Sequence, residues 1–249
     1  MKQQELQTGF GITLSVVFTI LIANYAFKNG TPTCKNYLTN TYLYLAFALT
    51  ILGMVSGSLP KTGKVATMIQ NGFFLWFILL IGLIIWFSFI PAKNIVGTHF
   101  LWLALILLFA FLISPLIGIS SGDSILQAIM ITIFIFLAMT IVAVMFEDKL
   151  RGHLSLIGTA LLITLLSVIV FELFAIFTGF YSKNENIRRM VSYFVIFIFC
   201  IFLVYDTVSI RKRAGECSEK TNPANYPRES FDLFLDIINI FVRMLGLSR

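Results

Sequence analysis

The sequence predicts an all-α fold, a polytopic bundle of seven to eight transmembrane helices around a central C-terminal helix. Three observations lead to this prediction. Of the 249 residues, 58% are hydrophobic and 12% are charged, which is about half the charged fraction of a typical soluble domain. Eight apolar segments are each long enough to cross the roughly 30 Å hydrocarbon core of a bilayer. The last segment carries polar residues that fall on a single helical face.

The apolar segments follow one another with only short polar connections between them. They cover residues 9–27, 42–59, 73–90, 100–119, 125–145, 154–180, 190–210 and 230–247. No connection is long enough to fold alone, so we expect one multi-span membrane domain over residues 1–249. The first segment is interpreted as an uncleaved span, because no small-residue cleavage site follows it. The net charge of +6 is spread over the loops, which favours contact with the lipid bilayer and not with nucleic acid.

The last segment, residues 230–247, contains four polar side chains at helical spacing. Asp232, Asp236, Asn239 and Arg243 follow one another at steps of four, three and four, so they share one face of a helix. A charged side chain at the centre of a bilayer costs about 2.5–3.5 kcal/mol. The polar face must therefore contact protein or water, which is why we expect the other spans to surround this helix.

Asp206 and Asp236 are the main candidates for a functional site. Both lie near the loop that connects the last two segments, so adjacent antiparallel helices bring the two carboxyl groups to similar depth. In a low-dielectric site two such groups share a proton, and one apparent pKa rises toward neutrality. The protonated pair would close a latch, and the deprotonated pair would offer oxygen ligands to Ca²⁺. The alternative for Asp206 is an interfacial side chain that reaches water.

The other intramembrane polar residues have structural interpretations beside the functional ones. Asp232 is interpreted as an acid in the first turn of its helix, with a cation relay as the alternative. Asn239 is expected to hydrogen-bond a neighbouring helix, and Arg243 to extend to the membrane interface near the chain end. Glu172 has no partner that the sequence identifies, so hydrogen bonding while protonated and lining a cavity both stay open.

The cysteines and histidines indicate no metal site. Cys34, Cys200 and Cys217 are scattered and odd in number, so we expect neither a disulfide framework nor a ligand cluster. His99 and His153 lie at the edges of apolar segments and are interpreted as interfacial polar residues. The basic loop before the last segment weakly favours a cytosolic position for that loop. No cofactor is expected apart from Ca²⁺ as a possible transported ion.

Two motifs resemble the Bax inhibitor-1 family, the transmembrane Bax-inhibitor-motif proteins with bacterial calcium-leak members. They are VYDT at residues 204–207 and LFLDIINIF at residues 233–241. The resemblance implies a helical bundle around the C-terminal helix, a di-aspartyl pH sensor at Asp206 and Asp236, and a pH-sensitive Ca²⁺ leak. In cells with apoptosis it implies suppression of cell death. The bacterial members also lock the sensor with an arginine near the end of an early helix, where the nearest basic residue here is Lys93.

Three classes of function follow from these observations. The first is a pH-sensitive calcium-leak channel or cation regulator in an endomembrane or a bacterial inner membrane. The second is a non-conducting membrane protein that interacts with cell-death regulators or membrane proteases, or that belongs to a viral membrane. The third is an intramembrane aspartyl protease, which the apolar LDII context of Asp236 disfavours because such sites need a Gly-rich turn. We therefore expect no enzymatic activity.

Overall fold

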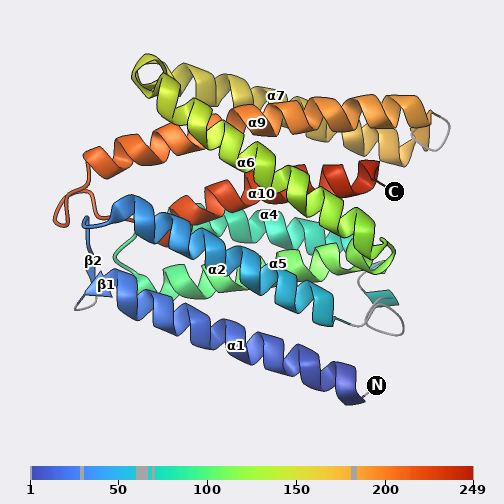
Figure 1. Cartoon of the computed structure of the whole chain (residues 1–249), viewed down its shortest axis with the longest axis horizontal. Helices are drawn as coiled ribbons and strands as arrows, with labels where there is room; N and C mark the ends of the chain where they lie inside the picture. The colour runs from blue at the N-terminus through green and yellow to red at the C-terminus, as the bar shows by residue number, and fades with distance from the viewer. Residues whose placement is uncertain (1, 29–30, 60–66, 69–70, 181–183, 249) are drawn as a thin grey trace. The chain divides into compact units, whose positions relative to one another are not determined.

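The computed structural model consists of helices joined by short connections, as the sequence predicts. It describes residues 2–28, 31–59, 67–68, 71–180 and 184–248 (Figure 1). The helices are α1 (Lys2–Ala26), α2 (Tyr37–Ser58), α4 (Phe73–Phe89), α5 (Ile95–Gly118), α6 (Gly122–Arg151), α7 (Leu154–Phe177), α9 (Glu185–Gly215) and α10 (Tyr226–Leu247). Two short strands, β1 (Phe27–Lys28) and β2 (Thr31–Pro32), pair antiparallel between α1 and α2. The all-α polytopic fold is thus confirmed.

Most of these helices can cross a bilayer. Among the described residues, six are long and apolar enough to do so: those beginning at Gln7, Tyr37, Ile95, Gly122, Leu154 and Glu185. Helix α4 is a shorter apolar helix, and α10 carries Asp232, Asp236 and Arg243 in its apolar sequence. Only 11% of the apolar window of α6 and of α7 is buried within the protein. Such large apolar faces are what a helix presents to lipid and not to water.

The chain divides into two compact units. One comprises residues 1–120 and 214–234, and the other comprises residues 121–213 and 235–249. Helices α9 and α10 therefore each contribute to both units. The expectation of a single membrane domain stays a prediction.

The first unit is built around an aromatic core. Helix α2 packs against α1 and α5, and α4 packs against α5. Tyr44, Trp102 and Tyr226 are fully buried, and the ring of Tyr44 lies 5.4 Å from that of Trp102 and 6.1 Å from that of Tyr226. Edge-to-face and offset ring pairs of this kind stabilise a core beyond the burial of apolar area.

The same unit contains a disulfide that the cysteine spacing does not predict. Cys34 and Cys217 are bonded, with their Cα atoms 5.7 Å apart and a separation of 183 positions in the sequence. The bond joins the segment before α2 to the loop before α10. The expectation of no disulfide framework was wrong, because the fold brings together two cysteines that no sequence spacing relates. Cys200 is the free cysteine among the described residues.

The second unit packs α6, α7 and α9 around a small apolar cluster. Ala143, Leu154 and Val208 form its buried centre, one from each helix. Helix α6 begins where the Ser121 side chain accepts a hydrogen bond from the backbone N–H of Ser124, at 3.1 Å. This hydroxyl cap satisfies a backbone donor that the helix itself leaves unpaired.

Candidate functional site

Helix α10 carries the polar stripe, and its start is defined by a cap. The Asn225 side chain accepts a hydrogen bond from the backbone N–H of Arg228 at 3.3 Å, and Pro227 occupies the first turn, where a missing N–H costs nothing. Within Tyr226–Leu247, all of which the structure describes, Arg228 is the one exposed residue. Helix α10 is thus largely enclosed by protein, as its polar face requires.

The early start of α10 changes the interpretation of Asp232. We expected the helix to begin near Ser230, which would place Asp232 in the first turn. Because α10 begins at Tyr226, the acid of the first turn is Glu229, and Asp232 lies in the second turn. Asp232 is half-buried there, so its interpretation as a first-turn acid is wrong.

Asp206 and Asp236 lie in the same compact unit, on α9 and α10 respectively. Asp236 is buried, with 3% of its surface exposed, and Asp206 is half-buried. Asp206 precedes the end of α9 by nine residues, about 14 Å, and Asp236 follows the start of α10 by ten, about 15 Å. Each aspartate thus lies about one turn farther from its helix end than the apolar segments indicated, and the two distances still match. Both residues take part in interactions with other groups of the protein.

Glu172 and Arg243 form an ion pair inside the second unit. An Arg243 guanidinium nitrogen donates to Glu172 Oε2, which joins α10 to α7. The two side chains are 26% and 18% exposed, for Arg243 and Glu172 respectively. Arg243 was expected to extend to the membrane interface near the chain end; the structure adds that a carboxylate on α7 pairs with its charge. The pairing also supplies the partner that the sequence left open for Glu172.

Two further candidate residues make local contacts. Asn239 donates its side-chain amide to the carbonyl of Leu235 at 2.8 Å, one turn earlier on α10. This donor is thus used within its own helix, where we expected a bond to a neighbouring helix. Lys93 lies exposed in the turn between α4 and α5, and its Nζ donates to the carbonyl of Lys220 at 3.3 Å.

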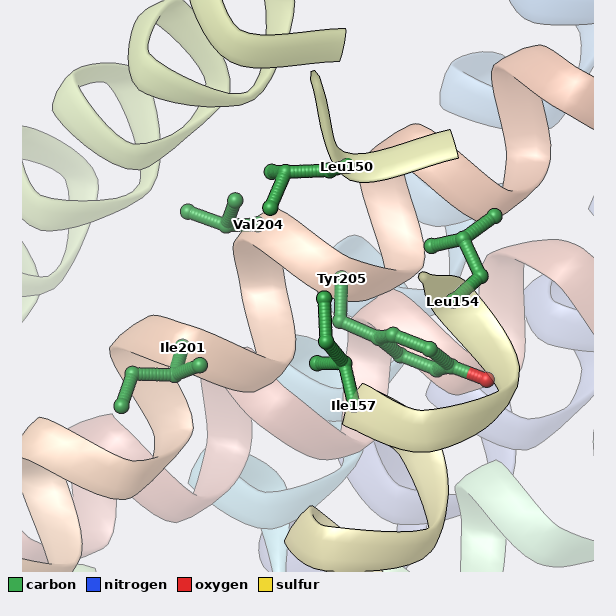
Figure 2. Close-up of a pocket in the computed structure, with 6 residues that line it drawn as sticks. All are labelled: Leu150, Leu154, Ile157, Ile201, Val204 and Tyr205. Carbon is green, nitrogen blue, oxygen red and sulfur yellow. The ribbon is translucent and has the colours of Figure 1, made fainter. Parts of the chain in front are cut away.

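An apolar cavity of about 210 Å³ adjoins the residues that precede Asp206. It is lined by Leu150, Leu154, Ile157, Ile201, Val204 and Tyr205 (Figure 2). Figure 2 shows the ring of Tyr205 extending from α9 toward α7. A Cβ added at Gly158 of α7 would lie 2.5 Å from the Tyr205 hydroxyl oxygen. The missing side chain at Gly158 therefore permits the close packing of Tyr205 on α7.

A charged cluster follows Asp206 toward the end of α9. Arg211 Nε donates to Glu147 Oε2 at 2.5 Å, and Arg151 donates to Glu147 Oε1 at 2.6 Å. The Glu147 side chain is 12% exposed. Bonds from two guanidinium groups to one carboxylate are charge-assisted. They connect the end of α6 to α9 one to two turns beyond Asp206.

The first unit contains a buried polar network that the sequence does not indicate. His99 is 6% exposed, so its interpretation as an interfacial residue was wrong. Its Nδ1 lies 2.7 Å from the carbonyl of Ile95, an acceptor, so Nδ1 carries the hydrogen. Nε2 of the neutral ring then accepts from the Tyr44 hydroxyl at 2.5 Å. In the same unit Tyr37 donates to Glu229 Oε1 at 3.0 Å. The two residues are 192 positions apart, so the sequence does not predict this hydrogen bond.

Comparison with known proteins identifies a family and several relatives of this chain. Residues 34–248 match the family described as inhibitor of apoptosis-promoting Bax1. The chain is 26% identical over 237 residues to Bax inhibitor 1 of Schizosaccharomyces pombe, covering 88% of this chain and 80% of that protein. It is 32% identical over 123 residues to the Golgi anti-apoptotic protein of vaccinia virus, covering 49% of this chain and 46% of that protein.

A plant protein, LIFEGUARD 1 of Arabidopsis thaliana, is 29% identical over 131 residues, covering 52% of this chain and 51% of that protein. The matched region thus spans about half the length of the vaccinia and plant relatives. The family match, in contrast, includes every helix from α2 to α10. The protein belongs to the Bax inhibitor-1 family.

Proposed function

We propose that this protein is a pH-sensitive Ca²⁺ leak of an endomembrane, gated by Asp206 and Asp236, and that it restrains cell death in its host cell. The observation that carries the proposal is the placement of the two aspartates. They lie at matched depth on α9 and α10 within one compact unit, and Asp236 is 3% exposed. Carboxyl groups inside membrane helices are candidate functional sites by default.

The proposed gate operates through one proton. Two carboxylates enclosed in a low-dielectric site repel each other when both are ionised, so near neutral pH one proton is retained between them. Loss of that proton as pH rises leaves two negative groups, which separate and accept a hard cation through their oxygen atoms. The site would thus bind protons and ions and would transform no substrate, so no catalytic step belongs to the proposal.

The role in cell death rests on the relatives. The vaccinia relative is named a Golgi anti-apoptotic protein, and the fission-yeast relative is named Bax inhibitor 1. These names support an endomembrane location and an anti-apoptotic role for this chain. A non-conducting interaction with cell-death regulators is the alternative, and protection of cells by the double Asp206→Asn, Asp236→Asn variant would favour it.

Calcium flux from proteoliposomes tests the gate. The wild type should release Ca²⁺ faster at about pH 8 than at about pH 6, because the shared proton is lost as pH rises. Asp206→Asn and Asp236→Asn should each remove this pH dependence. The matched control is Asp123→Asn, the same chemical change at an exposed residue in the first turn of α6. A wild-type flux that is equal at both pH values, as in every variant, would refute the gate.

A further inference from the structure

The Glu172–Arg243 pair is unusual because both charges lie within helices of a membrane unit. Glu172 precedes the end of α7 by five residues, and Arg243 precedes the end of α10 by four. Each side chain is at least half enclosed by protein. Placing a lone charge at such depth costs a few kcal/mol, and removing one partner of an enclosed ion pair leaves the other uncompensated. Each residue therefore supplies the counter-charge that the other needs at this position.

The pair has an unused acceptor. Arg243 donates to Glu172 Oε2, whereas Glu172 Oε1 is enclosed and accepts no hydrogen bond from any of the residues described in the structure. An ionised carboxylate oxygen without a donor is unfavourable in an apolar environment. A water molecule or a hard cation would supply the missing contact. Glu172 is thus a carboxylate that a guanidinium satisfies on one side only.

The position of the pair relates it to the aspartates. Arg243 follows Asp236 by seven residues on α10, which is about 10 Å along the helix axis. Asn239 lies between them on the same face, three residues after Asp236 and four before Arg243. Asp236, Asn239, Glu172 and Arg243 all belong to the second unit. Polar groups therefore continue along α10 from the aspartate to the ion pair.

We infer that Glu172 and Arg243 form a second gate for cations, at the far end of the polar stripe from Asp206 and Asp236. This inference rests on the proposed function, since it assumes that a cation moves along the stripe. In the closed arrangement the Arg243 guanidinium binds the Glu172 carboxylate, and the positive charge of Arg243 repels an approaching Ca²⁺. In the open arrangement the cation contacts the Glu172 carboxylate while Arg243 withdraws, so the negative charge of Glu172 is neutralised throughout.

Opposite effects of the two neutral substitutions distinguish a charge gate from a structural clamp. Arg243→Gln removes the repelling charge and should raise Ca²⁺ flux at about pH 8 by about tenfold or more. Glu172→Gln leaves Arg243 without its counterion and should lower the flux by about tenfold or more. A clamp that only holds α7 to α10 is broken equally by both substitutions, so it predicts changes of the same sign.

Controls separate charge from folding. Arg243→Lys retains the positive charge and should keep the flux within about twofold of the wild type, and Arg243→Met provides a second neutral variant should the glutamine variant not fold. The matched control is Arg189→Gln, which breaks the exposed pair of Arg189 with Glu185 on α9 and should leave the flux unchanged. Thermal unfolding of each variant in detergent shows how much stability was lost.

The outcomes separate this inference from the proposed function. Raised flux for Arg243→Gln together with lowered flux for Glu172→Gln supports the second gate, and the reverse pair of changes would overturn it. Changes of the same sign, or none, in a wild type that conducts would overturn the second gate and leave the aspartate gate standing. A wild type that conducts no Ca²⁺ at either pH refutes the proposed function, and the second gate with it.

Discussion

Breaking the Cys34–Cys217 disulfide should destabilise the first unit without unfolding the helices. The bond closes a loop of 183 residues, for which chain entropy alone gives an upper value of about 5 kcal/mol. Helices that stay in detergent or lipid restrict the unfolded chain, so we expect a smaller loss, about 2–4 kcal/mol. For a chain of this length that loss lowers the thermal midpoint by about 5–15 °C.

The assay compares reductant with substitution. Wild-type protein in detergent should unfold at a lower temperature when reductant is added, and the Cys34→Ser, Cys217→Ser variant should unfold at that lower temperature with or without reductant. Cys200→Ser is the matched control, since Cys200 is free, and it should keep the full response to reductant. A wild type whose midpoint ignores the reductant, or a double variant that still responds to it, would refute the reasoning.

Two further predictions concern packing in each unit. Gly158→Ala should lower the free energy of unfolding by about 1–3 kcal/mol, because the new Cβ would lie 2.5 Å from the Tyr205 hydroxyl. Adding Tyr205→Leu should recover most of that loss in thermal unfolding. A Gly158→Ala protein as stable as the wild type would contradict this prediction. His99→Leu should cost about 1–3 kcal/mol by leaving the buried Tyr44 hydroxyl without its acceptor. Adding Tyr44→Phe should then cost little more, whereas strictly additive losses would show that the bond is not made.

Hydropathy predicted the helices because apolar segments lie in lipid or in the protein interior, whereas polar segments face water. The apolar segments 190–210 and 230–247 correspond to α9 (Glu185–Gly215) and α10 (Tyr226–Leu247), yet both helices extend past the apolar residues. The backbone hydrogen bonds of a helix continue through Arg211 and its basic neighbours into the interface. Composition therefore indicates where the apolar residues stop and not where the helix ends, which is why Asp206 and Asp236 lie farther from their helix ends than expected.

Contacts between distant segments could not be predicted from the sequence. Periodicity placed Asp232, Asp236, Asn239 and Arg243 on one face because helical spacing is a local property. The partner of Arg243 lies 71 residues away on α7, and nothing in the spacing of a single chain selects it. The bond between Cys34 and Cys217 is hidden for the same reason. Intramembrane charge indicated that Glu172 needs a partner, and only the packing of α7 on α10 supplies one.

The proton that the proposed gate places between Asp206 and Asp236 can be tested for directly. Difference infrared spectroscopy of the protein in lipid, between about pH 6 and about pH 8, reports the carbonyl stretch of a protonated carboxyl group. The proposed gate predicts a carboxylic acid band at the lower pH that disappears as pH rises through neutrality, because two close carboxyl groups would then give up the proton they share. The band should be absent from both Asp206→Asn and Asp236→Asn proteins. A spectrum with no such band, or a band that survives both substitutions, would contradict the account.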